Sequence, residues 1–287
     1  MKQQFRNVKL RPDSLARIEQ CNAIIDDYLA QGLKLTLRQL YYQLVSRNII
    51  PNVERSYKNL SSLVSDARLA GLMDWEAIED RVRQPRRQSE FDGLKDLTEA
   101  ALRSYRLPRW KGQDSYVELW VEKDALAGVL APLASKYHVT MMVNRGYSSQ
   151  SAMYESANRF IENSGHMAKD SVLFYLGDHD PSGEDMVRDI RERLEMFGVR
   201  DIAVAKLALT MEQIKKHNPP PNPAKVTDPR AAGYIAAHGQ QSWEVDALDP
   251  PVLTQIIERA FQSVLDTELM EQVKAKEEAD KKRLRKA

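Results

Sequence analysis

The part of the chain that follows residue 115 alternates short apolar runs with segments of helical spacing. Residues 172–176 are consecutively apolar and bounded by Ser171 and Gly177, a pattern typical of a strand buried on both faces. Three more strands are expected, at residues 116–121, 139–143 and 201–209. Helices are expected between them, at residues 125–137, 149–161 and from Ser182, with Asp185 completing a capping box, to Gly198. This alternation predicts an α/β fold with a parallel sheet flanked by helices.

The first third of the chain shows helical spacing instead. Three helices are expected, at residues 14–30, 37–48 after a Thr36 cap, and 53–70. The first is expected to bury Leu15, Ile18, Ile25 and Leu29. A short link before the third helix fits a helix-turn-helix arrangement, with residues 72–82 as the wing of a winged helix. A small helical bundle with a solvated basic face fits the spacing equally well.

Arginines gather just beyond these helices. They are Arg81, Arg83, Arg86 and Arg87. A run of charge is usually a solvated face, but beside a helix-turn-helix it is also a candidate phosphate contact. A helix is expected at residues 94–105, and Pro108 and Gly112 mark a connector. We therefore expect a winged-helix domain over residues 1–113.

The second domain is expected to cover residues 114–270. A short strand at residues 242–248 and a helix at residues 251–269 complete it. Residues 271–287 form a charged helical tail, expected to be solvated or partly disordered.

Composition sets limits on the class of protein. Of 287 residues, 43% are hydrophobic and 29% charged, which is ordinary for a soluble protein. No apolar run approaches the roughly 20 residues that span a bilayer, and the amino terminus lacks the apolar core of a secretion signal. Cys21 is the only cysteine, which excludes an intrachain disulfide and fits a cytoplasmic location. Residues 1–114 hold 20 Lys and Arg against 15 Asp and Glu, a mild basic bias that permits a nucleic-acid partner.

Acidic residues follow two of the expected strands. Asp178 and Asp180 come two residues apart after the apolar run 172–176, so their side chains project to the same side. Glu122 ends the strand at residues 116–121. Carboxyl ends of strands are where open α/β sheets bind ligands, and paired carboxylates suit Mg²⁺. A lone Asp-X-Asp turn more often serves capping and solvation, and His179 is more often a hydrogen-bonding spacer than a base.

The second helix carries two adjacent tyrosines in different positions. Tyr41 falls on the apolar stripe and is expected in the core. Tyr42 lies about 100° off that stripe and shares its side with Arg38, four residues away. An exposed phenol is usually only surface, but a neighbouring cation favours the phenolate and makes Tyr42 a candidate nucleophile. Lys123, next to Glu122, would add positive charge at the same strand end.

The acidic motifs carry a resemblance to a known domain. A strand ending in Glu (VELWVEK) and a later strand ending in Asp-X-Asp (YLGDHDPSG) resemble the Toprim domain of topoisomerases, primases and related nucleases. Four motifs in order, TLRQLYYQL, NRGYSS, DHDPSGEDM and LALTMEQI, resemble the A subunit of topoisomerase VI and its meiotic double-strand-break relatives, over about residues 34–260. The usual GKGYP of that family reads NRGYS here, with Ser148 in place of proline.

The resemblance implies a role for each candidate residue. Tyr42 would be the nucleophile and Arg38 its neighbouring phosphate contact, while Glu122, Asp178 and Asp180 would bind Mg²⁺. It also implies a homodimer acting on double-stranded DNA, in which the tyrosine of one subunit serves the metal of the other. Nothing in the chain resembles the ATPase subunit of the family, so that partner would be a separate chain.

The expected function is Mg²⁺-dependent DNA cleavage by tyrosine transesterification through a 5′-phosphotyrosyl link, in the cytoplasm and at the nucleoid. One alternative is a hydrolytic Toprim nuclease, of the defence or mobile-element type, that does not use Tyr42. The other is a DNA-binding protein without catalysis, against which the three carboxylates argue.

Overall fold

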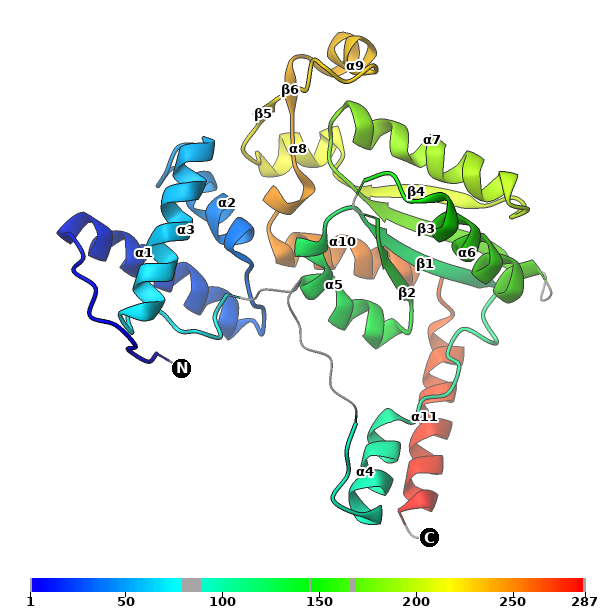
Figure 1. Cartoon of the computed structure of the whole chain (residues 1–287). Helices are drawn as coiled ribbons and strands as arrows, with labels where there is room; N and C mark the ends of the chain where they lie inside the picture. Colours follow the sequence, from blue (N-terminus) through cyan, green and yellow to red (C-terminus); the bar gives the residue numbers. More distant parts are fainter. Residues whose placement is uncertain (1, 79–88, 145, 166–168, 286–287) are drawn as a thin grey trace.

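A four-stranded parallel sheet forms the centre of the computed structural model, which describes residues 2–78, 89–144, 146–165 and 169–285. The strand order is β2-β1-β3-β4 (Figure 1). The strands are β1 (Ser115–Val121), β2 (Thr140–Val143), β3 (Asp170–Leu176) and β4 (Ala203–Ala208). The predicted α/β fold with a parallel sheet is confirmed, and each strand lies close to its expected position.

Helices cover both faces of this sheet. They are α5 (Asp124–Tyr137) and α10 (Pro250–Ser263) on one face, and α6 (Gln150–Phe160), which continues as a π-turn (Ile161–Gly165), with α7 (Pro181–Met196) on the other. Leu119 and Phe174 pack into the first layer, whereas their neighbours Trp120 and Tyr175 pack into the second. Because both faces are covered, nearly every position of β1 and β3 is buried, which explains the continuous apolar runs.

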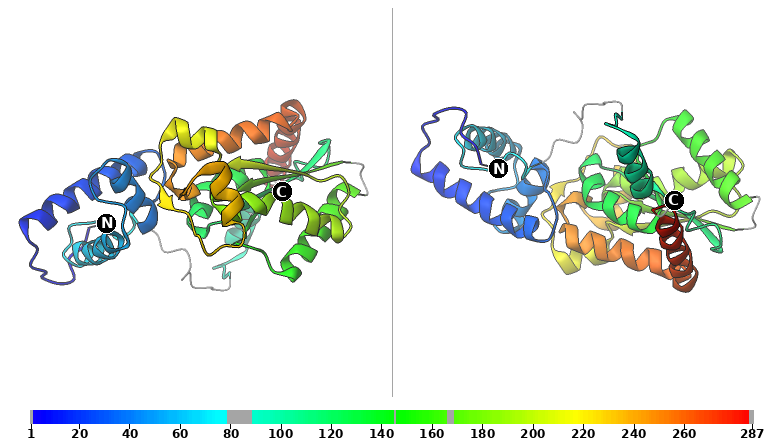
Figure 2. Two further views of the ribbon diagram at one scale, coloured as in Figure 1. Left: turned by 90° about the horizontal axis from the view of Figure 1, so that it is seen from above. Right: turned by 90° about the horizontal axis from the view of Figure 1, so that it is seen from below.

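Three helices form the amino-terminal body, at one end of the molecule (Figure 2). They are α1 (Pro12–Ala30), α2 (Leu37–Ser46) and α3 (Glu54–Leu69). The buried side of α1 runs through Ile18, Cys21, Ile24, Ile25 and Tyr28. Leu15 and Leu29, which were expected in the core, are exposed because they lie at the edges of that stripe.

The predicted winged helix is not confirmed. Residues 72–78 form turns and one isolated bridge between Leu35 and Ile78, and no strand is assigned to them. The rest of the expected wing and the four arginines Arg81, Arg83, Arg86 and Arg87 lie outside the described residues. The phosphate contact expected of these arginines stays a prediction.

The segment between β4 and α10 contains short elements that the sequence pattern did not predict. They are α8 (Met211–His217), β5 (Asn222–Pro223), α9 (Ala231–His238), β6 (Gln241–Ser242) and a 3₁₀ turn, η2 (Val245–Ala247). β5 and β6 form an antiparallel pair. The strand expected at residues 242–248 is therefore wrong beyond Ser242, because the chain turns there to run across the end of the sheet.

The helix expected at residues 251–269 is two helices. α10 ends at Ser263, and α11 (Thr267–Leu284) begins afresh with Asp266 as its cap, the carboxylate accepting from the Leu269 N–H at 3.0 Å. Among the helices of the described residues, none has the length and apolar character needed to cross a bilayer.

Helix α11 lies beside α4 (Leu94–Ser104) in Figure 1. The Tyr105 hydroxyl donates to Asp280 (3.1 Å), and the Leu107 N–H donates to Glu277 (3.0 Å). Glu277 is buried and paired with Lys281 Nζ at 2.8 Å. The tail is helical as predicted, but this side of it is packed rather than solvated, because a segment about 170 residues earlier in the chain covers it.

Candidate functional site

The predicted acidic residues meet at the carboxyl end of the sheet. Glu122 follows β1 and Asp178 and Asp180 follow β3, and these two strands are neighbours. Asp180 is the N-cap of α7, its Oδ1 accepting from the Gly183 N–H (2.7 Å) and from the Ser182 hydroxyl (2.8 Å). The expected capping box of Ser182 with Asp185 is therefore wrong, because Asp180 takes the capping position.

Each predicted carboxylate is fixed by a backbone N–H group. Glu122 Oε2 accepts from the Asp178 N–H (2.9 Å), and Asp178 Oδ1 accepts from the Val245 N–H (2.8 Å). Among the described residues, the hydrogen bonds made to Glu122, Asp178 and Asp180 use one oxygen of each carboxylate. The side chains are thus held in place, and the second oxygen of each makes no hydrogen bond among the described residues; that of Asp180 lies 3.7 Å from Lys225 Nζ.

These three carboxylates do not form a compact cluster. Within the described ranges, the one group of three or more His, Cys, Asp or Glu side chains with ligand atoms within 4.8 Å of one another is His179, Glu184 and His238. Oxygen ligands of Mg²⁺ lie about 2.0–2.1 Å from the ion, and the ion usually keeps several waters, so one or two of the carboxylates suffice to hold it. The donor set fits Mg²⁺ in chemistry, and its assignment stays a prediction.

Helix α2 carries Tyr42 and begins with a complete capping box. Thr36 accepts from the Gln39 N–H (3.3 Å) while the Gln39 side chain accepts from the Thr36 N–H (2.8 Å), as the sequence predicted for Thr36. Tyr42 itself is only 3% exposed, so the expectation of an exposed phenol is wrong. Its hydroxyl donates to Glu244, which belongs to the segment between β6 and α10. That segment packs on α2 and covers the face that the helical spacing left open.

Lys123 lies at the centre of a group of acidic side chains. Its Nζ is 2.7 Å from Asp246, 2.9 Å from Glu244 and 3.1 Å from Asp178. The lysine is 19% exposed, and the carboxylate of Asp246 is fully buried. Lys123 therefore links Asp178 to Glu244, and through Glu244 to the Tyr42 hydroxyl.

Arg38 lies on the outer side of the same group. Its guanidinium is 3.4 Å from Glu244 and 3.8 Å from Asp246, and about half of its side chain is exposed. Asp246 Oδ2 is buried and has no hydrogen-bond partner among the described residues. Arg38 can thus turn part of its surface to a ligand, and Asp246 Oδ2 has Arg38 as an ion-pair partner but accepts no hydrogen bond among the described residues.

Burial and charge shift the acidities of these groups. Burial, together with the charges of Asp246 and Glu244, raises the pKa of the Tyr42 phenol above its usual range. Burial also raises the pKa of Asp178, against the opposing effect of Lys123. Burial alone would lower the pKa of Lys123, but the three carboxylates around it outweigh burial and raise it. Lys123 is therefore held as a cation and Tyr42 as a neutral phenol in this arrangement.

A pocket of about 260 Å³ opens between α2 and the end of the sheet. Its walls include Arg38, Tyr41, Tyr42, Asp178, Asp180, Lys225 and Glu244. The structure thus brings four predicted site residues of one chain to one pocket: Tyr42, Arg38, Asp178 and Asp180. Glu122 and Lys123 lie behind this wall, in contact with Asp178.

Glu244 and Asp246 were not predicted as site residues. They stand two residues apart, the same spacing as Asp178 and Asp180, and this spacing was the available signal. The signal was weak, because the strand expected at residues 242–248 would have placed both residues within the strand and not at its end. The segment acquires its position only by packing on α2.

No protein-family model matches the chain, and no curated protein matches it.

Proposed function

We propose that this protein cleaves double-stranded DNA in a Mg²⁺-dependent reaction with Tyr42 as the nucleophile, in the manner of a topoisomerase VI A subunit with a Toprim domain. The observation that carries the proposal is the shared pocket. One chain presents there a phenol, a guanidinium and the carboxylates of Asp178 and Asp180. These are the groups that attack a phosphodiester, contact its phosphate and hold a divalent cation.

The charge of the site supports a need for a divalent cation. Six carboxylates belong to the pocket and its back wall, at Glu54, Glu122, Asp178, Asp180, Glu244 and Asp246. Arg38, Lys123 and Lys225 offset them only in part. A DNA phosphate would be repelled from such a site unless more positive charge were bound. One or two of Glu122, Asp178 and Asp180 would hold Mg²⁺, which would supply charge stabilisation for the phosphoryl group.

Glu244 would accept the proton of the Tyr42 hydroxyl and also orients the phenol. Glu244 already accepts the Tyr42 hydroxyl proton in a hydrogen bond, so it would take that proton as the phenol oxygen bonds to phosphorus. The bond from phosphorus to the 3′ oxygen breaks, that oxygen leaves as a 3′ hydroxyl after taking a proton from solvent water, and the 5′ phosphate stays on Tyr42. Arg38, half exposed beside the phenol, would contact the phosphate oxygens.

We propose that this site is complete within one chain. The family resemblance implies a tyrosine serving the metal of a partner subunit, whereas Tyr42 and Asp178 here belong to the same pocket of the same chain. A homodimer, a separate ATPase subunit and a location at the nucleoid stay predictions. Mixing Tyr42→Phe protein with Asp178→Asn protein would restore cleavage only if the site were shared between subunits, so we expect no recovery.

Supercoiled plasmid provides the direct test of the function. Protein and plasmid are incubated with Mg²⁺, stopped with denaturant, and assayed for cut DNA and for protein attached to 5′ ends, with EDTA in the control. We expect cleavage and covalent attachment in Mg²⁺ and neither in EDTA. Intact plasmid under all conditions would contradict the proposal.

One observation favours a hydrolytic Toprim nuclease as a second candidate. Tyr42 is buried and its pKa is raised, so the phenol in this state is a weaker nucleophile than an ordinary tyrosine. A nuclease that uses water would cut the plasmid in Mg²⁺ and leave no protein on the 5′ ends. The attachment assay therefore separates the two candidates.

A further inference from the structure

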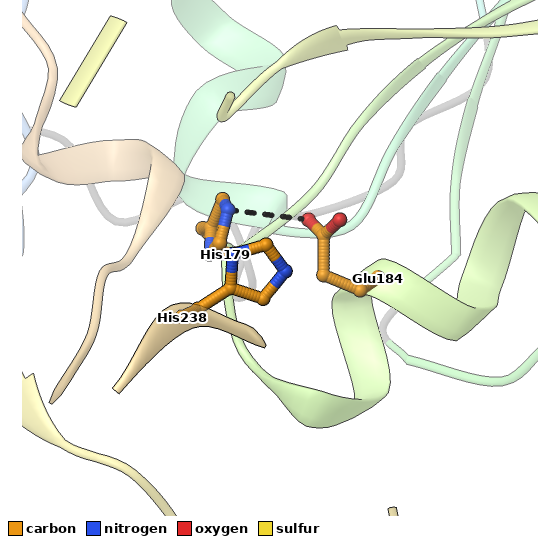
Figure 3. A group of neighbouring side chains, drawn as sticks. All are labelled: His179, Glu184 and His238. Atoms are coloured by element: carbon orange, nitrogen blue, oxygen red, sulfur yellow. Dashed lines mark ion pairs between the residues drawn. The ribbon is translucent and has the colours of Figure 1, made fainter. Parts of the chain in front are cut away.

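We propose that His179, Glu184 and His238 form a binding site for a divalent transition-metal ion of the Zn²⁺ class, distinct from the pocket of Tyr42. The three side chains each offer a ligand atom, and these atoms lie within 4.8 Å of one another. Figure 3 shows them directed toward one another from separate elements. None of the three lines the pocket that holds Tyr42.

Each ligand is placed by a different part of the fold. His179 lies in the turn between β3 and α7, Glu184 in the first turn of α7, and His238 is the last residue of α9. His179 is 2% exposed, and its ring lies 4.8 Å from the ring of His238 between centroids. A buried imidazole next to a second imidazole and a carboxylate is an arrangement suited to a bound cation.

A hydrogen bond to Tyr234 presents the correct nitrogen of His179. The Tyr234 hydroxyl is 2.9 Å from two carbonyl oxygens, those of His179 and Gln241, and 2.9 Å from His179 Nδ1. Since the hydroxyl has two carbonyl oxygens as acceptors for its proton, we assign its oxygen as the acceptor of a hydrogen bond from Nδ1–H. Nε2 then carries the lone pair, and this is the nitrogen that faces Glu184. Metal-binding histidines are commonly oriented in this way by a partner on the other nitrogen.

The spacing of the ligands also fits an ion. His179 Nε2 and Glu184 Oε1 are 3.7 Å apart, which is too far for a hydrogen bond. Two ligand atoms that are each about 2.0–2.2 Å from a tetrahedral Zn²⁺ are separated by roughly 3.3–3.6 Å. The gap between these atoms therefore accommodates an ion with little movement.

Lys206 supports the carboxylate from behind. Its Nζ is 2.6 Å from Glu184 Oε1 and also donates to the backbone oxygens of Asp178 (2.8 Å) and Gly183 (3.3 Å). Among the hydrogen bonds of the described residues, none uses Glu184 Oε2. The oxygen that Lys206 contacts is the one that faces His179 Nε2, and a carboxylate oxygen has two lone pairs. Oε1 can thus accept from Lys206 and still bind an ion, with Lys206 as an outer-shell partner.

The donor types select the metal. Two imidazole nitrogens and one carboxylate favour Zn²⁺ and its neighbours, whereas Mg²⁺ prefers oxygen ligands alone. An ion here would tie α9 to α7. The backbone of His179 also exchanges two hydrogen bonds with Trp243 (2.8 and 3.0 Å), next to Glu244. The ion would therefore stabilise the segment that carries Glu244 against the sheet.

Cobalt(II) absorption spectroscopy tests the site. Tag-free protein is titrated with Co²⁺ in the presence of excess Mg²⁺, which occupies oxygen-only sites. We expect one Co²⁺ per chain, with the intense d–d absorption of a tetrahedral site, and displacement by Zn²⁺. His238→Gln and Glu184→Gln should each weaken binding by roughly tenfold or more. His217→Gln, at an exposed histidine outside the cluster, should bind as the wild type does.

Thermal unfolding gives an independent measurement. Zn²⁺ should raise Tm in the wild type and in Asp178→Asn, because the ligands are intact in both, and much less in Glu184→Gln. If His238→Gln does not fold, Glu184→Gln alone decides the question. The proposal is overturned if the wild type binds no Co²⁺, or if both ligand variants bind it as tightly as the His217→Gln control; the rings of His179 and His238 would then only pack together.

Discussion

The three residues Asp178, His179 and Asp180 face two different environments at the end of one strand. The aspartates line the pocket with Tyr42, where oxygen donors and fixed charges predominate. His179 instead contacts Tyr234, Glu184 and His238, where imidazole nitrogens gather. Alternate side chains of extended backbone point to opposite sides, so one short stretch serves two chemistries. His179 forms the hydrogen bond expected of a spacer, and the proposed metal site would give it a second role.

A change in the backbone turn that carries Asp178, His179 and Asp180 should disrupt both the pocket of Tyr42 and the cluster around His179. A Cβ atom at Gly183 would lie 2.1 Å from the carbonyl oxygen of Asp178, a contact that the turn cannot accommodate without moving. We expect Gly183→Ala to destabilise the fold by about 3 kcal/mol or more and to abolish both cleavage and Co²⁺ binding. Urea unfolding measures the first effect.

Gly233→Ala is the matched control, since nothing lies within 4 Å of a Cβ atom there and the residue is helical. It should leave stability unchanged or raise it by about 0.5–1 kcal/mol. Equal behaviour of the two glycine variants would show that the turn does not hold the two sides together.

A change at a single side chain should affect either cleavage at the pocket or Co²⁺ binding at the cluster, but not both equally. Asp178→Asn keeps an acceptor for the Val245 N–H but removes the charge, so cleavage in Mg²⁺ should be lost while Co²⁺ binding is retained. His238→Gln should show the opposite selectivity, with a much larger loss of Co²⁺ affinity than of cleavage. Paired plasmid and Co²⁺ titrations measure both. Full cleavage by Asp178→Asn would refute the assignment of Asp178 as a Mg²⁺ ligand.

The largely buried Lys123 should contribute to the stability of the fold. Lys123→Met leaves Asp178, Glu244 and Asp246 without their shared partner, which should cost about 3 kcal/mol at neutral pH. Mg²⁺ should raise the urea midpoint of this variant more than that of the wild type, because it replaces the missing charge. Lys225→Met removes a lysine whose side chain is 74% exposed and should change stability by less than about 0.5 kcal/mol. Similar losses in the two lysine variants would contradict the central role given to Lys123.

The smallest expected effect comes from two equivalent helix caps. Thr36 and Thr210 each form a complete capping box, at α2 and at α8. Thr36→Ala and Thr210→Ala should each cost about 1 kcal/mol in urea unfolding. Only Thr36→Ala should also slow cleavage, because α2 carries Arg38 and Tyr42. A larger effect of Thr210→Ala than of Thr36→Ala on the cleavage rate would contradict the proposal that α2 positions the groups needed for cleavage.

The parts of the fold predictable from sequence are those set by local pattern. The four strands and the acidic residues at their ends follow from apolar runs and their boundaries, and Thr36 follows from its capping sequence. The burial of Tyr42 depends on a segment about 200 residues later in the chain, which no local spacing reports. The same holds for Glu277, which is buried by a segment far from it in sequence.

The central claim is that Tyr42 is the nucleophile, and Tyr42→Phe tests it most directly. Phenylalanine keeps the ring and its packing while removing the oxygen that Glu244 holds. Tyr41→Phe is the control, since Tyr41 lines the same pocket but its hydroxyl donates to Asn52 (2.9 Å) and not to Glu244. With supercoiled plasmid and Mg²⁺, we predict that Tyr42→Phe loses both cleavage and protein attached to 5′ ends, while Tyr41→Phe keeps both. Cleavage by Tyr42→Phe at the wild-type rate, with free 5′ ends, would contradict the account and establish the hydrolytic nuclease in its place.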